Sequence, residues 1–219
     1  MYDAKRSFYE TGYGGFRERK LLSLFVRGPN VLDVACGTGR HLPFLARKGF
    51  EVVGLDLSRG MLIVAKNKIK GYKKAHFVRA DAESLPFREN AFDEIVCSRA
   101  FKFFPNPLRA LEEGRKVLRK GGKSILAIET SEPFWIRIGY KLKIPYMGSS
   151  FEWRYRVKTI HFLLKKAGFK IYFTGCIFYF GKTVYQIAGK YLSASLKLLE
   201  LIDSHSRIGR NTLIIGIKN

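Results

Sequence analysis

Residues 31–40 read VLDVACGTGR, and this stretch decides the fold. Its first half is a short apolar run, which is typical of a strand buried on both faces of a parallel sheet. Its second half is a Gly-x-Gly turn formed by Gly37 and Gly39. Glycine has no Cβ, so the backbone at such a turn can come close to a ligand. The stretch therefore predicts a strand, a turn and a helix, with a ligand at the carboxyl end of the strand.

The turn lacks the fingerprint of proteins that bind nicotinamide dinucleotides. That fingerprint is Gly-x-Gly-x-x-Gly, and its third glycine would stand at position 42, where this chain has Leu42. The strand also carries Asp33, whose negative charge suits a pyrophosphate poorly and suits a ligand with a cationic end. The sequence thus disfavours a dehydrogenase.

Strand-like and helix-like patterns alternate along most of the chain. Such alternation predicts parallel βαβ units with right-handed crossovers. Strands are expected at residues 30–35, 51–55, 76–79, 92–97, 123–129, 169–173 and 212–217, and helices at 41–48, 58–69, 108–118, 157–167 and 184–201. The last two strands are expected to pair antiparallel at the sheet edge. The predicted fold is α/β, Rossmann-like and doubly wound, with a mostly parallel seven-stranded sheet, an antiparallel edge strand and a small aromatic cap.

Two further acidic residues follow predicted strands. Asp56 ends the second strand, where a carboxylate can accept hydrogen bonds from both hydroxyls of a ribose. Asp81 and Ala82 follow the third strand, where they can bind an adenine amine and ring nitrogen. Each aspartate has a plainer interpretation, as a helix cap or a turn residue.

The ordered set of motifs VLDVACGTGRHL, VVGLDLSRGML, RADAESLPFRENAFDEIVCS and ALEEGRKVLRKGGKSIL resembles the class I S-adenosylmethionine-dependent methyltransferases. The resemblance covers roughly residues 29–128 and is strongest with the group that includes quinone and small-molecule methyltransferases. It implies an enzyme that uses S-adenosylmethionine as its cofactor.

The resemblance also implies roles for the matching positions. The methionine part of the cofactor would lie beside Asp33, Ala35, Gly37 and Gly39. The ribose would be held by Asp56, and the adenine would be flanked by Leu57 and bound at its edge by Asp81 and Ala82. Ser98 would lie near the sulfonium and the acceptor, and Tyr13 would close over the cofactor. No metal is expected, and no catalytic residue is assigned.

Composition bears on the partners. The chain has 40 basic and 18 acidic side chains, for a net charge of +22. Such a charge attracts RNA, anionic lipid or an acidic metabolite, and it also occurs on surfaces that only aid solubility. The leading hypothesis is methylation of a small, lipid-like or anionic acceptor, with the aromatic residues of segment 130–156 lining an apolar pocket. The alternatives are a tRNA or rRNA methyltransferase, and a non-catalytic binding protein with a methyltransferase-like domain.

The chain is expected to form one domain. It would comprise an N-terminal helical lid (1–28), a cofactor-binding core (29–129), a cap insertion (130–156) and a C-terminal part of the sheet with an inserted helix (157–219). Three widely spaced cysteines (Cys36, Cys97 and Cys176) favour reduced thiols over a disulfide framework. The N-terminus is too polar for a signal peptide, and no apolar run approaches the roughly 20 residues that span a bilayer. These features predict a cytoplasmic protein without stable membrane insertion.

Overall fold

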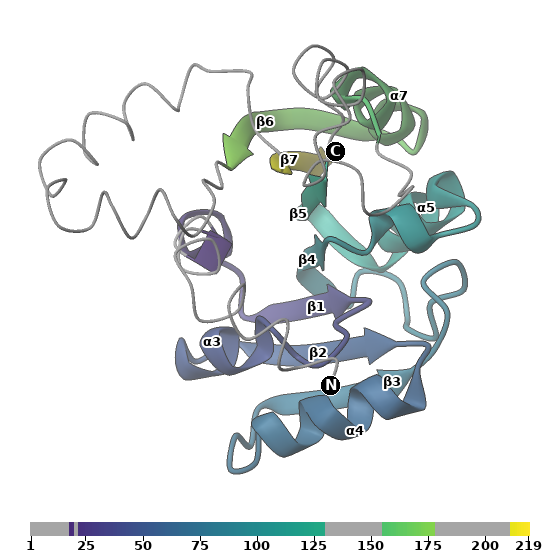
Figure 1. Ribbon diagram of the computed structural model, residues 1–219. Helices are drawn as coiled ribbons and strands as arrows, with labels where there is room; N and C mark the ends of the chain where they lie inside the picture. The colour runs from purple at the N-terminus through teal and green to yellow at the C-terminus, as the bar shows by residue number, and fades with distance from the viewer. Residues whose placement is uncertain (1–17, 20–21, 130–154, 178–210) are drawn as a thin grey trace, which may run out of the picture.

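The structure is a computed structural model that describes residues 18–19, 22–129, 155–177 and 211–219. Its centre is a seven-stranded sheet with the strand order β3-β2-β1-β4-β5-β7-β6 (Figure 1). The strands are β1 (Asn30–Val34), β2 (Glu51–Asp56), β3 (Ala75–Arg79), β4 (Phe92–Ser98), β5 (Leu118–Glu129), β6 (Phe169–Ile177) and β7 (Asn211–Lys218).

Strands β1 to β5 pair in parallel, and β7 pairs antiparallel with both β5 and β6. The predicted fold class is confirmed. The antiparallel strand, β7, lies one position in from the edge, between β5 and β6. The predicted cap, the helix at 184–201 and the predicted lid before Glu18 lie outside the described residues.

Both faces of the sheet are covered by helices. The helices are α3 (Leu42–Arg47), α4 (Arg59–Lys68), the 3₁₀ helix η1 (Phe101–Phe103), α5 (Pro107–Val117) and α7 (Val157–Lys166). Side chains of α3 and α4 share one core cluster with the helical residues 22–25, and side chains of α5 and α7 share another on the opposite face. Figure 1 shows α5 and α7 side by side near the β5–β7–β6 end of the sheet. None of the described helices is long and apolar enough to cross a membrane.

Strand β1 shows why the sequence forms a buried central strand. Leu32 and Val34 point into the core beneath α5, and Val31 points into the core beneath α3 and α4. Because successive side chains of a strand point to opposite faces, a strand covered on both faces needs a continuous apolar run. The run VLDV meets this need at every position except Asp33.

Strand β5 begins earlier than the sequence pattern indicates. The sequence pattern predicts a helix that ends at residue 118 and a strand that begins at residue 123, but β5 already begins at Leu118, which pairs with Phe92. The register shifts between Phe92 and Glu94, so the glycine pair lies in a bulge inside the strand. Gly121 has φ +76°, and a Cβ at Gly122 would come within 2.8 Å of two carbonyl oxygens. The bulge therefore requires glycine at these positions. In the sequence alone, the same pair of glycines is typical of a turn between a helix and a strand.

Candidate functional site

The turn after β1 has the backbone geometry of a close approach to a ligand. Ala35, Gly37 and Gly39 all have positive φ angles, of 53°, 56° and 75°. A Cβ at Gly39 would lie 3.0 Å from the Cβ of Ala65, so this glycine lets α4 pack against the turn. A Cβ at Gly37 would meet no described atom within 4 Å. The outer side of the turn is therefore open at Gly37, where a ligand could lie on the backbone.

Asp56 joins this turn to the end of β2. One carboxylate oxygen accepts a hydrogen bond from the backbone N–H of Gly37 at 2.8 Å, and the other accepts one from Ser58 at 2.8 Å. Ser58 in turn caps α4 by accepting from the N–H of Met61. The structure thus brings together Gly37 and Asp56, two residues that the sequence assigned to one site. Each oxygen of Asp56 keeps a second lone pair for a ligand.

Leu57, Asp81 and Ala82 follow the neighbouring strand ends. Leu57 is an apolar side chain with 63% of its surface exposed. Asp81 is exposed and accepts a hydrogen bond from the N–H of Glu83 at 2.9 Å, which is the turn geometry that a plainer interpretation predicts. Ala82 is buried against the core. Since β2 and β3 are neighbours in the sheet, their carboxyl ends lie at the same edge.

Asp33 is the most unusual residue of the site. Only 2% of its surface is exposed, and its Oδ2 has no hydrogen-bond partner among the described residues. Burial is the main cause that raises the pKa of this carboxyl to about 7. The positive charges of His41 and Arg40 lower the pKa, and the negative charges of Glu18 and Asp56 raise it. A buried acceptor without a partner costs free energy, so such an atom indicates a place for a donor that is not part of the described chain.

The sequence analysis did not identify Glu18, which the structure places at the centre of a buried charge cluster. The carboxylate of Glu18 lies 3.1 Å from Arg40, 3.4 Å from His41 and 3.7 Å from Arg99, and it accepts a hydrogen bond from the hydroxyl of Ser98. Burial raises its pKa, but the nearby imidazole of His41 and the charges of Arg40 and Arg99 outweigh this effect and hold the pKa below its usual range. We call these five residues the Glu18 cluster.

Ser98 is held in the Glu18 cluster through its hydroxyl group. The hydroxyl of Ser98 donates to Glu18 in this structure, so its proton is engaged within the protein. No local signal marks Glu18, because residues 16–25 form an ordinary charged amphipathic stretch. Arg40, which follows the Gly-x-Gly turn directly, is the one sequence cue that a buried acid could be needed nearby.

Other residues considered from the sequence lie outside the described residues or away from this site. Tyr13 lies outside the described residues, so its role stays a prediction. His161 lies on α7, and its Nε2 is 2.8 Å from the hydroxyl of Thr174 on edge strand β6. Cys36 and Cys97 are buried free thiols, and burial raises the pKa of Cys97 to about 12, so neither has the character of a nucleophile.

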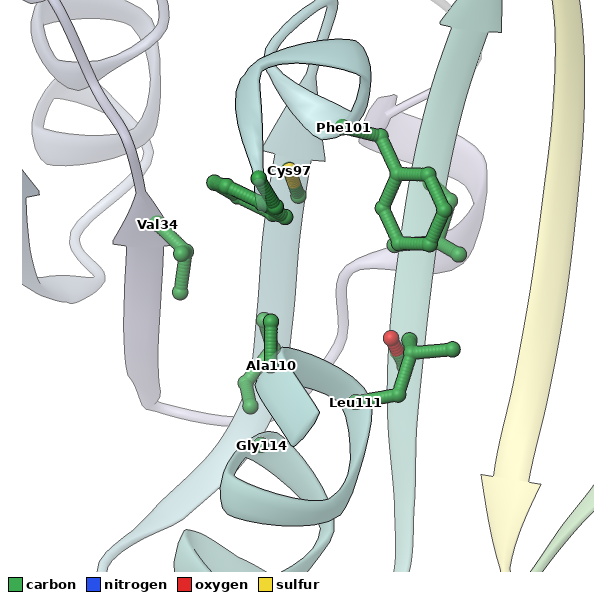
Figure 2. A pocket seen from close by; sticks show the side chains of 10 residues that line it. Val34, Cys97, Phe101, Ala110, Leu111 and Gly114 are labelled. Carbon is green, nitrogen blue, oxygen red and sulfur yellow. The ribbon is translucent and has the colours of Figure 1, made fainter. Parts of the chain in front are cut away.

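A small cavity lies on the face of the sheet that α5 covers. It has a volume of about 20 Å³ and lies between the sheet and α5 (Figure 2). Its lining is almost entirely apolar and consists of Val34, Ile95, Cys97, Phe101, Phe104, Ala110, Leu111, Gly114, Ser124 and Leu126. The cavity has room for about one water molecule and none for a cofactor, so we interpret it as a packing defect of the core.

Comparison with known proteins finds a family match over the middle of the chain. Residues 32–126 match the family model described as a methyltransferase domain. The chain is 36% identical over 118 residues to a demethylmenaquinone methyltransferase of Clavibacter sepedonicus, a match that covers 53% of this chain and 48% of that protein. It is 34% identical over 140 residues to a demethylmenaquinone methyltransferase of Bacillus velezensis, covering 59% of this chain and 60% of that protein. The chain therefore spans about half the length of the curated relatives it matches.

Solved structures of methyltransferases are similar in fold. A SAM-dependent methyltransferase from Thermotoga maritima superposes with a TM-score of 0.72 and 21% identity, and the match covers 100% of this chain and 95% of that one. A SAM-dependent methyltransferase from Aquifex aeolicus superposes with a TM-score of 0.66 and 18% identity, covering 97% and 93%. Identities this low bear on the fold alone. Residues 32–126 are thus similar in sequence to a methyltransferase domain, and the described sheet is similar in fold to that of SAM-dependent methyltransferases.

Proposed function

We propose that this protein transfers a methyl group from S-adenosylmethionine to a small, lipid-like acceptor. The observation that carries the proposal is Asp33, a buried carboxylate with an unpartnered oxygen at the end of β1, directly before a glycine turn that is open on its outer side. The methionine part of S-adenosylmethionine carries an ammonium group, which is a donor of the required charge. Asp33 and the turn at Gly37 thus fit this cofactor.

The other strand ends supply groups for the nucleoside. Asp56 would accept hydrogen bonds from the ribose hydroxyls through the lone pairs that Gly37 and Ser58 leave free. Leu57 would pack its exposed side chain on the adenine, and Asp81 and Ala82 would bind the adenine edge. Ala35 and Gly39 would shape the turn beneath the methionine part. These roles agree with the positions of the residues along one edge of the sheet.

The main task of the protein in this reaction would be to position the two reactants. The cofactor supplies a methyl group on a positively charged sulfur, which is a good leaving group. The chain's own residues would hold the reactants in line and exclude water, which are large contributions to such a transfer. Ser98 is the last residue of β4, which pairs with β1, and Arg99 follows it, so both would lie on the acceptor side, and the guanidinium of Arg99 could hold an anionic acceptor. No general base is assigned.

A lipid-like acceptor is favoured by the relatives. The curated relatives are named demethylmenaquinone methyltransferases, and demethylmenaquinone is a quinone with an apolar tail. RNA methylation is the second candidate, and the net charge of +22 favours it. The two are separated by the uptake of labelled methyl groups. Uptake into a demethylated isoprenoid quinone supports the first, and uptake into tRNA or rRNA supports the second.

Titration calorimetry tests the cofactor site directly. We expect S-adenosylmethionine and S-adenosylhomocysteine to bind and NAD not to bind. Asp56→Ala should weaken the binding of both by about 1.5–3 kcal/mol, because charge-assisted hydrogen bonds are lost.

Asp93→Ala is the matched control for this titration. Asp93 also holds a backbone N–H, that of Asn30 at 2.9 Å, but at the opposite end of the strands. Its removal should leave the affinity unchanged. Failure of the wild-type protein to bind either compound would leave a non-catalytic, methyltransferase-like binding protein as the function. Equal affinity of wild type and a folded Asp56→Ala variant would refute the ribose assignment.

A further inference from the structure

The Glu18 cluster places a buried negative charge among cations at the proposed cofactor site. Glu18 is 1% exposed, and the side chains of Arg40 and Arg99 are 15% and 19% exposed, so solvent screens their charges weakly. The carboxylate of Glu18 lies within 4 Å of the guanidinium groups of both Arg40 and Arg99. Its charge therefore offsets a concentration of positive charge at this point.

The positions of the two arginines explain why this balance matters. Arg40 directly follows the Gly-x-Gly turn, and Arg99 directly follows β4, the strand that pairs with β1. The two arginines thus flank the edge of the sheet at which the proposed function places the sulfonium. A cation bound there would be repelled by Arg40 and Arg99 and attracted by Glu18 and Asp33.

We propose that Glu18 is a specificity-determining residue that lets this site accept a positively charged ligand by offsetting part of the positive charge of Arg40 and Arg99. The inference rests on the proposed function, since it concerns how the same site distinguishes S-adenosylmethionine from S-adenosylhomocysteine. These two compounds differ by one methyl group and one positive charge on the sulfur. Glu18 acts through the arginines and needs no contact with the ligand itself.

The experiment compares the two dissociation constants in wild type and in Glu18→Gln. The substitution removes one negative charge and keeps the shape of the side chain. Two unit charges roughly 10 Å apart, in a medium with an effective dielectric constant of about 20, interact strongly enough to change a dissociation constant roughly ten-fold. We therefore expect the dissociation constant of S-adenosylmethionine to rise about ten-fold more than that of S-adenosylhomocysteine. The titrations are run at pH 8.5, so that Asp33 is ionised in every variant.

Glu94→Gln is the matched control. Glu94 is a buried carboxylate that pairs with Lys123 at 3.2 Å and accepts hydrogen bonds from Arg27 and Gly28. It therefore also links the segment before β1 to the sheet, but near the start of β4, away from the strand ends of the site. Glu94→Gln should leave the ratio of the two dissociation constants unchanged even if it lowers the melting temperature.

Two further variants keep the test decisive if Glu18→Gln folds poorly. Glu18→Asp keeps the charge and should preserve the wild-type ratio. Arg99→Gln removes a positive charge and should shift the ratio the opposite way, in favour of S-adenosylmethionine. If Glu18→Gln weakens both ligands equally, or if Arg99→Gln does not reverse the shift, Glu18 has only a structural role and the inference is overturned. If wild type binds neither ligand, the proposed function fails first, and the inference fails with it.

Discussion

Asp33 and Glu18 show how two buried carboxylates acquire opposite properties from their neighbours. Burial raises the pKa of both. Around Glu18 the nearby cations outweigh burial, whereas around Asp33 burial and the negative charges of Glu18 and Asp56 outweigh His41 and Arg40. Glu18 is therefore ionised and internally satisfied, and Asp33 is a strained group that gains from a cationic ligand. Perturbed groups of this kind are typical of functional sites.

The raised pKa of Asp33 predicts how stability depends on pH. The folded protein binds the Asp33 proton with a pKa of about 7, compared with 3.8 for an unperturbed carboxyl. The group therefore favours the folded state fully below about pH 4, and this contribution is lost as pH rises towards 7. Asparagine cannot ionise, so Asp33→Asn should abolish this decrease in stability with rising pH. Above pH 7 the free energy of unfolding of the ligand-free variant should exceed that of wild type by about 1–3 kcal/mol. Urea unfolding of both proteins at several pH values between 5 and 8 measures the difference.

The same substitution should weaken the binding of S-adenosylmethionine, because a neutral amide can accept a hydrogen bond from the cofactor's ammonium group but cannot form an ion pair with it. Asp33→Asn would then be more stable and less functional, a trade-off that a purely structural residue does not show. A stability difference between the two proteins that stays constant across this pH range would contradict the raised pKa.

At the scale of elements, helix α5 contains a glycine that lowers its stability. Gly114 lies inside this helix and faces the cavity of Figure 2, although glycine is among the weakest helix formers. A Cβ at Gly114 would lie 3.3 Å from Cδ1 of Ile95, the far end of a flexible side chain that also lines the cavity. A methyl group therefore fits at this position once Ile95 shifts by a few tenths of an ångström.

Gly114→Ala should raise the free energy of unfolding by about 0.5–1 kcal/mol, because it improves helix propensity and fills part of the cavity. Gly60→Ala in α4 is the control, since a Cβ there meets only the hydroxyl of Ser58 at 3.8 Å and fills no cavity. Denaturant unfolding of both variants separates the two effects. A loss of stability in Gly114→Ala would mean that Ile95 cannot move to make room.

At the scale of the whole molecule, charge is the dominant property. The net charge of +22 exceeds what solubility needs and destabilises the compact state through repulsion. Because the Debye length falls from about 30 Å at 0.01 M salt to about 10 Å at 0.1 M, added salt screens this repulsion.

We expect the melting temperature to rise by about 2–5 °C when sodium chloride is raised from roughly 20 to 300 mM. Potassium glutamate at the same ionic strength serves as the control for effects specific to chloride. A melting temperature that falls with salt would show that attractive ion pairs outweigh the net repulsion. In that case the surface charge would be organised in networks rather than in excess.

The sequence by itself determined the parallel core of this protein and the candidate residues at the ends of its strands. Apolar runs, the turn at Gly37 and Gly39, and aspartates directly after strands are local patterns, and a parallel sheet brings such strand ends to one edge. The roles of these residues toward a cofactor stay predictions.

Only the tertiary structure decided the Glu18 cluster, the bulge in β5 and the place of β7 between β5 and β6. Glu18 and Ser98 are 80 positions apart, and a charged residue on an amphipathic helix gives no sign of the partner it will meet. Strand order and buried ion pairs depend on which distant surfaces pack together, and that is a property of the whole chain rather than of any one stretch.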